Sequence, residues 1–218
     1  MRVAAMTAAE LQACIPPHGL DGALTVPEGA QGVVVFAHGS GSSRFSARNL
    51  QVARALNGRR LATLLFDLLT EPEAQDRRNV FDIPLLAARL TDAIAFVGAQ
   101  APTAGLPIGL FGASTGAAAA LVAAAAKPDE VAAVVSRGGR PDLAGAALAE
   151  VRAPTLLIVG GADHGVIELN QDALEALRCE KRLQIVPGAT HLFQERGALE
   201  RVADLAAGWF EAHLRGPA

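Results

Sequence analysis

A serine lies at the centre of the pentapeptide Gly112-Ala113-Ser114-Thr115-Gly116, which is a G-x-S-x-G pattern. The apolar run Ile108–Phe111 precedes it, and the alanine-rich stretch Thr115–Ala126 follows it. A sharp turn from strand to helix brings the residues two before and two after the serine close together, so both must be very small. The pattern therefore predicts that Ser114 is an exposed nucleophile. The alternative is a glycine-rich helix start at which Ser114 is only a cap.

The segment His38-Gly39-Ser40-Gly41 follows an earlier apolar run. Glycines let a backbone approach a reacting carbonyl group that a side chain would obstruct. We expect the backbone N–H groups of Ser40 and Thr115 to form an oxyanion hole, which stabilises the charge on that carbonyl oxygen. A phosphate-binding loop is the alternative, but the Gly-Lys-Ser/Thr ending of such loops is missing. His38 is expected to form hydrogen bonds within the loop.

Asp163 follows the run Thr155–Val159 through three small residues. A carboxylate at this place could accept a hydrogen bond from a histidine Nδ1–H, fix the tautomer and stabilise the imidazolium. Asp67 also follows an apolar run, but it precedes Ser114, whereas the G-x-S-x-G motif accompanies the chain order serine, acid, histidine. We therefore assign the acid to Asp163.

His191 comes after the apolar run Leu183–Val186 and a short turn. Of the remaining histidines, His18 lies in a turn near the start and His213 in the last helical stretch. His164 is too close to the acid in sequence to be its natural partner. His191 is therefore the predicted general base, and a surface loop histidine without a role is the alternative.

The candidate site residues each follow a predicted strand, and the predicted strands alternate with predicted helices along the chain. Short runs rich in Val, Leu, Ile and Phe alternate with stretches of helical spacing, which indicates βαβ units and a mostly parallel sheet flanked by helices. The predicted strands are Gly32–Ala37, Leu61–Phe66, Ile108–Phe111, Val131–Val135, Thr155–Val159 and Leu183–Val186, with Leu20–Val26 as an antiparallel edge strand. The predicted helices are Asn49–Asn57, Ile83–Val97, Thr115–Ala126, Glu168–Leu177 and Leu199–His213.

The 218 residues suit one α/β domain over 1–218, with residues 1–18 as an N-terminal extension. The net charge of −3 and the absence of a basic run argue against nucleic acid as a partner. No uninterrupted apolar segment resembles a signal peptide or a membrane span, so we expect a soluble cytoplasmic protein. Cys14 and Cys179 are expected to be free thiols. The histidines and acids show no metal-site spacing, so we expect neither a metal nor a cofactor.

With these motifs in place, the sequence resembles the α/β-hydrolase superfamily and, within it, the dienelactone-hydrolase-like group. That group includes hydrolase domains sometimes found beside a phosphoribosyltransferase. The resemblance covers roughly residues 20–213 and depends on His38–Gly41, Gly112–Gly116, Asp163 and His191. Dienelactone hydrolases themselves use a cysteine nucleophile and carry a Gln-Glu pair where this chain has His38-Gly39. These departures leave acyl-transfer chemistry intact and make a dienelactone substrate doubtful.

The predicted function is a serine hydrolase that cleaves esters of small or flexible acyl groups through Ser114, His191 and Asp163. Acyl transfer or perhydrolysis on the same triad, and a non-catalytic ligand-binding role, are the alternatives. Only about 17 residues separate Arg137 from Pro154, which leaves no room there for a large cap domain. The predicted partner is a small-molecule ester, and we expect no binding to nucleic acid or to a membrane. A homodimer is possible on the sequence alone.

Two arginines are candidates for substrate binding because they stand near strand ends. Arg44 and Arg137, with Arg140 as a further candidate, could hold a substrate carboxylate or phosphate. The alternative is that they pair with Asp67, Asp142 or solvent.

Overall fold

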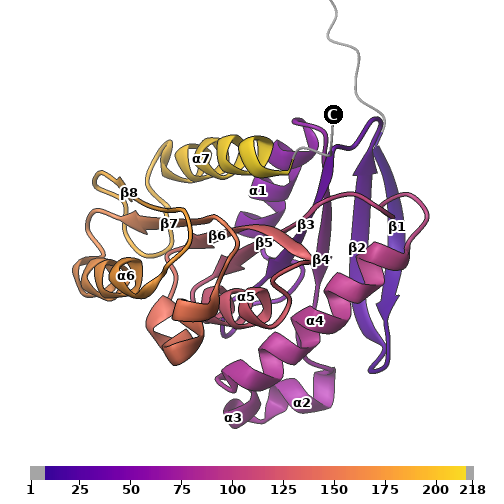
Figure 1. The fold of residues 1–218 in the computed structure, drawn as a ribbon, viewed down its shortest axis with the longest axis horizontal. Coiled ribbons are helices and arrows are strands. Elements are labelled where there is room, and N and C mark those ends of the chain that lie inside the picture. The colour runs from indigo at the N-terminus through magenta and orange to yellow at the C-terminus, as the bar shows by residue number, and fades with distance from the viewer. Residues whose placement is uncertain (1–7, 215–218) are drawn as a thin grey trace, which may run out of the picture.

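A computed structural model describes residues 8–214 of the chain, and Figure 1 shows its arrangement. Eight strands form one sheet in the order β1-β2-β4-β3-β5-β6-β7-β8. Their bounds are β1 Ala8–Ile15, β2 Leu20–Pro27, β3 Gly32–Ala37, β4 Leu61–Phe66, β5 Ile108–Ala113, β6 Val131–Arg137, β7 Thr155–Gly160 and β8 Lys181–Val186. The pairs from β4 through β8 are parallel, whereas β1 and β2 are antiparallel. The predicted α/β fold class with a mostly parallel sheet is confirmed.

The central strands are apolar because helices cover both of their faces. Every residue of β3, β4, β5 and β7 is buried, which explains why their sequences are continuous apolar runs without alternation. Strands β5, β6 and β7 extend one or two residues past the predicted ends, to Ala113, Arg137 and Gly160. The extra residues are small or polar, so the apolar pattern stops before the strand does.

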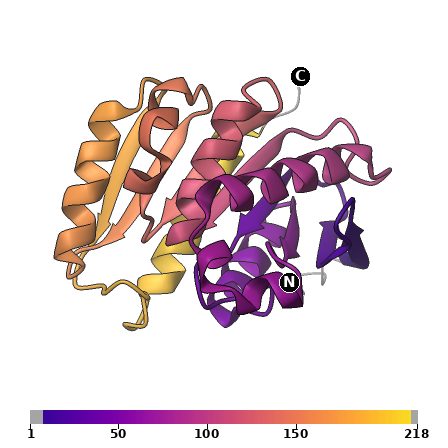
Figure 2. The ribbon, with the colours of Figure 1, turned by 90° about the horizontal axis from the view of Figure 1, so that it is seen from below.

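Two helical layers enclose the sheet. Helices α1 (Ala47–Asn57) and α7 (Ala198–His213) lie on one face, while α4 (Ile83–Ala99), α5 (Thr115–Ala126) and α6 (His164–Ala176) lie on the other (Figures 1 and 2). Two apolar clusters fill the layers, one under α4 and α5 and the other under α1 and α7. All five helices occur where the spacing of apolar residues predicts them, although α6 begins four residues earlier than expected.

The N-terminal segment differs from the prediction. Residues 1–7 of the expected extension lie outside the described residues, but residues 8–15 form β1, which pairs with β2 as a hairpin. Strand β1, and not β2, is therefore the edge strand. Only Ala13 and Ile15 of β1 are buried. Because so few of its residues are buried and alanine has a weak strand preference, the sequence pattern does not predict this strand.

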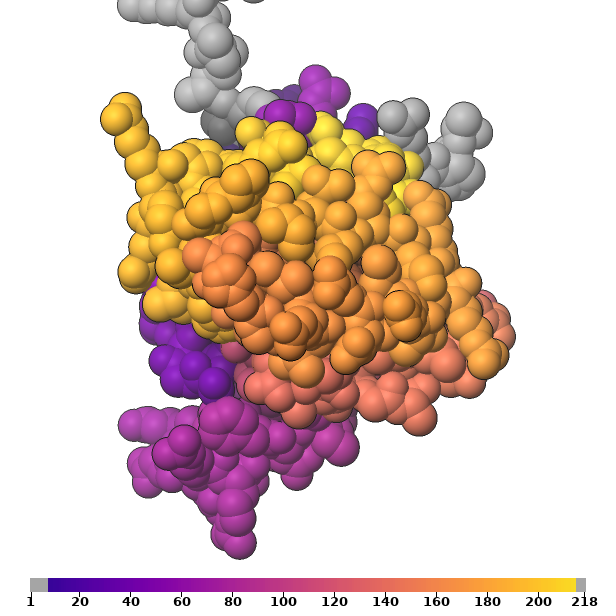
Figure 3. Space-filling model, turned by 90° about the vertical axis from the view of Figure 1, so that its left-hand side faces the viewer, coloured from indigo at the N-terminus to yellow at the C-terminus, as the bar shows by residue number. Residues whose placement is uncertain are grey.

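Three short helical segments lie between the predicted elements. They are α2 (Glu71–Gln75), α3 (Arg77–Val80) and the 3₁₀ segment η1 (Pro141–Glu150). Segments this short carry no helical apolar period, so composition alone does not show them. None of them forms a large cap domain, and η1 packs against α5 and α6. The face in Figure 3 is covered mainly by the C-terminal part of the chain, with residues of α2 to α4 below it.

Among the described helices none is both long and apolar enough to cross a membrane.

Helix α5 owes its place in the core to its small side chains. Nine of its residues are buried, and most of them are alanines with no exposed surface. Such a helix can approach the sheet and α4 closely, because a methyl group fills each contact. A longer side chain would force these neighbours apart.

We therefore predict that Ala123→Leu lowers the free energy of unfolding by roughly 1–3 kcal/mol, because Ala123 has no exposed surface and no room for a larger group. Ala126→Leu in the same helix is the control, since Ala126 is exposed and the change there should be small. Urea unfolding of both variants measures the difference. Equal stability of the two variants would contradict the close packing of α5.

Candidate active site

Ser114 stands at the tightest turn of the sheet, between β5 and α5. Its backbone has φ 52° and ψ −122°, a conformation that residues with a side chain rarely adopt. The two flanking glycines make this turn feasible: a Cβ on Gly112 would lie 2.4 Å from the Cα of Ala117, and one on Gly116 would lie 2.3 Å from the carbonyl oxygen of Ala37. The turn has the geometry that the G-x-S-x-G pattern predicts. Such strain costs of the order of 1–3 kcal/mol and is typical of functional sites.

The loop after β3 lies directly against this turn. A Cβ on Gly39 would come within 3.0 Å of both the Ser114 Cβ and the Ala113 carbonyl oxygen. The Ser40 N–H donates a hydrogen bond to Thr115 Oγ1 at 3.0 Å. The two backbone segments expected to form an oxyanion hole are therefore adjacent, and the Thr115 side chain already holds the Ser40 N–H.

Asp163 and His191 are joined by a hydrogen bond. His191 Nδ1 lies 2.7 Å from Asp163 Oδ2, and the Asp163 side chain is only 16% exposed. Asp163 stands at the N-cap of α6, yet its side chain makes no capping bond there. The carboxylate is thus hydrogen-bonded to the imidazole Nδ1. In a Ser-His-Asp triad this arrangement leaves Nε2 available as the base.

The loops that carry these two residues are packed backbone to backbone. A Cβ on Gly160 would lie 2.3 Å from the Ala189 carbonyl oxygen, and the Ala162 N–H donates to the same oxygen at 2.9 Å. The end of β7 therefore fixes the position of the loop that follows β8. Asp163 and His191 are 28 residues apart in the sequence, and this backbone contact brings them together.

A cavity of about 270 Å³ joins the predicted groups. Ser114, His191 and Ser40 line it together with Arg48 and Arg137, so the structure places the predicted nucleophile, the predicted base and one predicted arginine around one space. Among residues 8–214, no hydrogen bond links Ser114 to His191. Catalytic hydrogen bonds are often long before substrate binds, so the shared cavity is the relevant observation.

Arg137 is 6% exposed and lies at the end of β6. Burial, and secondly the nearby charge of Arg48, lower the pKa of Arg137 to about 10. Arg48 was not anticipated as a site residue, because it belongs to a helix whose amphipathic pattern does not mark it. Its nearness to the Gly39–Ser40 loop in sequence is the one signal that could have suggested it.

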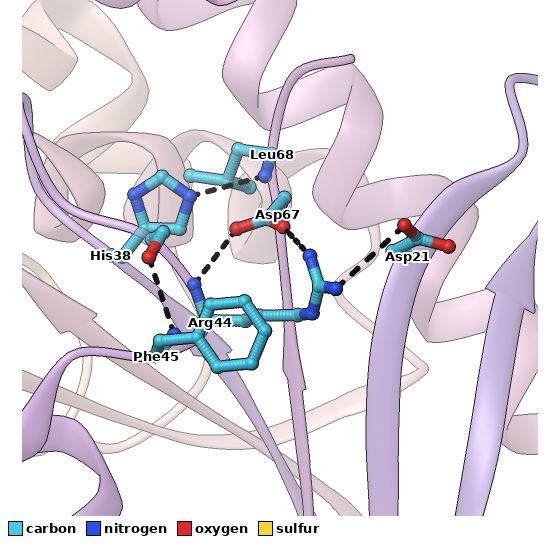
Figure 4. A network of polar contacts seen from close by, with 7 residues as sticks. Asp21, His38, Arg44, Phe45, Asp67 and Leu68 are labelled. Carbon is cyan, nitrogen blue, oxygen red and sulfur yellow. Dashed lines mark hydrogen bonds and ion pairs between the residues drawn. The ribbon is translucent and has the colours of Figure 1, made fainter. Parts of the chain in front are cut away.

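Arg44 lies elsewhere and is neutralised by acids. Figure 4 shows its guanidinium between Asp67 and Asp21, with ion pairs to both, and the Arg44 N–H also donates to Asp67 Oδ1 at 2.8 Å. Arg140 forms a two-point contact with Asp142. Pairing with an acid was the alternative to substrate binding in the sequence analysis, and the structure shows this pairing for both Arg44 and Arg140.

His38 connects the loop to β4. Its Nε2 accepts a hydrogen bond from the Leu68 N–H at 3.1 Å (Figure 4). Its Nδ1 lies 3.1 Å from the Gly39 carbonyl oxygen. Nε2 must be unprotonated to accept, so the neutral Nδ1–H tautomer fits both contacts. Burial lowers the pKa of His38, although the Gly39 carbonyl and the Asp67 charge oppose this. The expected hydrogen bond within the loop is present, and the bond to Leu68 is additional.

A second and larger cavity of about 490 Å³ lies on the other side of the Gly39–Gly41 loop. Its lining includes Leu20, Leu69 and Leu86 as well as Thr115, so it has an apolar wall next to the nucleophile turn. Within the described part of the chain, no group of three or more His, Cys, Asp or Glu side chains could hold a metal ion.

We predict that Gly160→Ala lowers the free energy of unfolding by at least roughly 2 kcal/mol and impairs the site, because the new methyl group would displace the loop that carries His191. Gly165→Ala is the control, since a Cβ on Gly165 meets nothing within 4 Å and alanine favours helix α6 by roughly 0.5–1 kcal/mol. Thermal unfolding and the rate of ester cleavage measure both effects. A Gly160 variant as stable as the Gly165 variant would contradict the contact.

We also predict a contribution of His38 to the pH dependence of stability. Because its folded pKa lies below 6.5, the stabilising contribution is complete above pH 6.5 and is lost as pH falls towards the folded pKa. Between pH 7.5 and 5.5 the free energy of unfolding should fall more in the wild type than in His38→Asn, which cannot titrate. Urea unfolding at the two pH values measures this difference. An equal change in the free energy of unfolding for the two proteins would contradict the prediction.

Comparison with known proteins shows what the sequence and the fold resemble. A crystal structure of a dienelactone hydrolase from Anabaena variabilis superposes with a TM-score of 0.92 at 54% identity, covering 96% of this chain and 99% of that one. A second structure, Est1E from Butyrivibrio proteoclasticus, has a TM-score of 0.76 at 15% identity, covers 93% of this chain and 98% of that one, and so supports the fold alone.

Curated relatives from two strains of Mycobacterium tuberculosis, both named "Putative phosphoribosyl transferase", are 60% identical over 208 residues, which is 95% of this chain. The chain spans 47% of the length of those relatives. The dienelactone hydrolase family matches residues 20–212. On this match, on the 54% identity to a dienelactone hydrolase and on the shared fold, the chain belongs to the dienelactone hydrolase family.

Proposed function

We propose that the protein is a serine hydrolase that cleaves carboxylic esters, with Ser114 as nucleophile, His191 as general base and Asp163 as the acid that orients it. The observation that carries the proposal is the 2.7 Å hydrogen bond between His191 and Asp163 beside a cavity that His191 shares with Ser114. The strained backbone of Ser114 supports it, since that turn presents the hydroxyl group at the edge of the sheet.

In the proposed reaction, His191 Nε2 takes the proton of the Ser114 hydroxyl group as its oxygen attacks the ester carbonyl. The tetrahedral intermediate collapses, the C–O bond of the ester breaks, and the proton passes from His191 to the departing alcohol. Water then attacks the acyl-enzyme in the same way and releases the acid. Asp163 keeps the proton on Nδ1 throughout and stabilises the imidazolium by its charge.

For the oxyanion we propose the N–H groups of Thr115 and Ser40. Thr115 begins α5, so its N–H lies at the positive end of the helix dipole. The Ser40 N–H would be shared between Thr115 Oγ1 and the substrate oxygen, because the bond to Thr115 already aims it at this turn. Bound substrate would thus exchange or bifurcate one existing hydrogen bond.

For the substrate we propose an ester of a small or flexible acyl group. The leucine-lined wall of the larger cavity beside Thr115 could receive such a group, and no large cap domain occurs within residues 8–214. We assign a substrate contact to Arg137 but not to Arg44, because the charge of Arg44 is already neutralised by Asp67 and Asp21. The same proposal includes a small-molecule ester as the partner, no binding to nucleic acid or membrane, and a cytoplasmic location. It leaves open whether the protein forms a homodimer.

Ser114→Ala should lower kcat/KM for a small p-nitrophenyl ester by roughly 10⁴-fold or more and abolish labelling by a fluorophosphonate probe, because both reactions need the serine oxygen. Thr91→Ala is the control, since Thr91 lies on α4 outside the linings of both cavities and its hydroxyl group donates to the Ala87 carbonyl oxygen of the same helix. Retained labelling or activity in the Ser114 variant would overturn the assignment. An unlabelled wild type would favour a ligand-binding role.

A further inference from the structure

The cavity beside Ser114 contains two positive charges and no negative one. Arg48 and Arg137 both line it, and none of its ten lining residues is acidic. The carboxylate of Asp163 lies outside this lining and is bound to His191 Nδ1. Both arginines line the same cavity of about 270 Å³, and the charge of Arg48 contributes to the lowered pKa of Arg137. Like charges in a partly buried space repel, so this pair destabilises the empty site.

Within residues 8–214 neither guanidinium has a charged partner. The Arg137 side chain makes one hydrogen bond there, donated by Nη2 to the neutral Asn49 Oδ1 at 3.3 Å. The Nε atoms of Arg48 and Arg137 are both buried without a hydrogen-bond partner in the described structure. A pKa of about 10 still leaves Arg137 charged at neutral pH. A buried charge without a counter-charge costs several kcal/mol, which is why proteins rarely keep one without a use.

The other arginines buried in this fold show the contrast. Arg89 is 5% exposed, and although its Nε is also unpartnered, its Nη2 lies 2.6 Å from Glu73. Arg44 is paired with Asp67 and Asp21. Arg89 and Arg44 therefore have acidic partners, whereas no ion pair within the described residues involves the two arginines beside the predicted nucleophile.

We propose that Arg48 and Arg137 form a binding site for a dianionic phosphate monoester carried by the ester substrate. This inference rests on the proposed esterase function and names its substrate class. A dianion would balance both positive charges, whereas a carboxylate would leave one uncompensated. The Nη–H groups of a guanidinium can donate charge-assisted hydrogen bonds to phosphate oxygens, and no acid among residues 8–214 pairs with those of Arg48 or Arg137.

The position of the pair would also orient the reaction. Ser114 and His191 line the same 270 Å³ space, so a phosphate held there would lie within a few bonds of the scissile ester. The hydroxyl groups of Ser42 and Ser46 line the cavity too and could complete the phosphate contacts. The apolar cavity across the Gly39–Gly41 loop would remain for the uncharged end of the substrate.

The test compares three phenyl acetates that differ in one group: 4-(hydroxymethyl)phenyl acetate, the carboxylate 4-acetoxyphenylacetate, and 4-acetoxybenzyl phosphate. The wild type should cleave the phosphate with kcat/KM at least tenfold above the neutral ester and severalfold above the carboxylate. In Arg48→Gln, the ratio of phosphate to neutral ester should fall at least tenfold, since one of two charge-assisted contacts is lost. Arg54→Gln is the control, because Arg54 is an exposed residue of the same helix, and its ratio should stay unchanged.

A wild type that prefers the carboxylate, or shows no preference among the three esters, would overturn the phosphate site. An Arg48 variant that keeps the wild-type ratio would do the same. Arg48 is half-buried and makes no hydrogen bond in the described structure, so Arg48→Gln avoids the folding risk of changing Arg137, and circular dichroism checks its fold.

Binding without turnover separates this inference from the proposed function. Calorimetric titration of the Ser114→Ala variant with inorganic phosphate should give a dissociation constant at least tenfold lower than that of the double variant Ser114→Ala, Arg48→Gln. Absence of phosphate binding would overturn the site even if the neutral ester is cleaved. Phosphate binding in a protein that cleaves no ester would support the site and overturn the esterase proposal instead.

Discussion

The site depends on backbone packing at the carboxyl edge of the sheet, where no side chain can be accommodated. At Gly116 a Cβ would lie 2.3 Å from the carbonyl oxygen of Ala37, and at Gly160 one would lie 2.3 Å from that of Ala189. The first contact presses the start of α5 against the loop after β3, and the second presses the end of β7 against the loop after β8. Each therefore joins two segments that are distant in sequence and that the proposed chemistry needs side by side.

These contacts in turn require the alanine-rich layer behind them. Helix α5 can begin against β3 only if its buried face approaches the sheet closely, and residues such as Ala118 and Ala120 have no exposed surface. The strained conformation of Ser114 is tolerable because the surrounding packing leaves no relaxed alternative. The glycines that raise the backbone entropy lost on folding thus make the turn geometry accessible.

The sequence predicted most of this architecture because the signals are local. Buried parallel strands read as apolar runs, and the turn around Ser114 imposes glycine at two fixed positions. Strand β1 was missed because only Ala13 and Ile15 face the core. Arg48 was missed for a different reason: its importance arises from Arg137, a residue 89 positions away, and no local pattern encodes that neighbour. Arg44 and Arg137 looked equivalent as strand-end arginines, and only the spatial arrangement of acids separates them.

The pairing of arginines with acids also differs between the cavity and the rest of the described structure. The chain neutralises Arg44, Arg89 and Arg140 with carboxylates, so it does not lack acids for pairing. Near Arg137 the neutral Asn49 takes the place that an acid would fill, and the result is a buried positive charge with an unused N–H. Replacing an internal counter-charge by an amide costs stability in the empty protein. The cost is recovered only when an anion enters the cavity, which couples charge neutralisation to substrate binding next to Ser114.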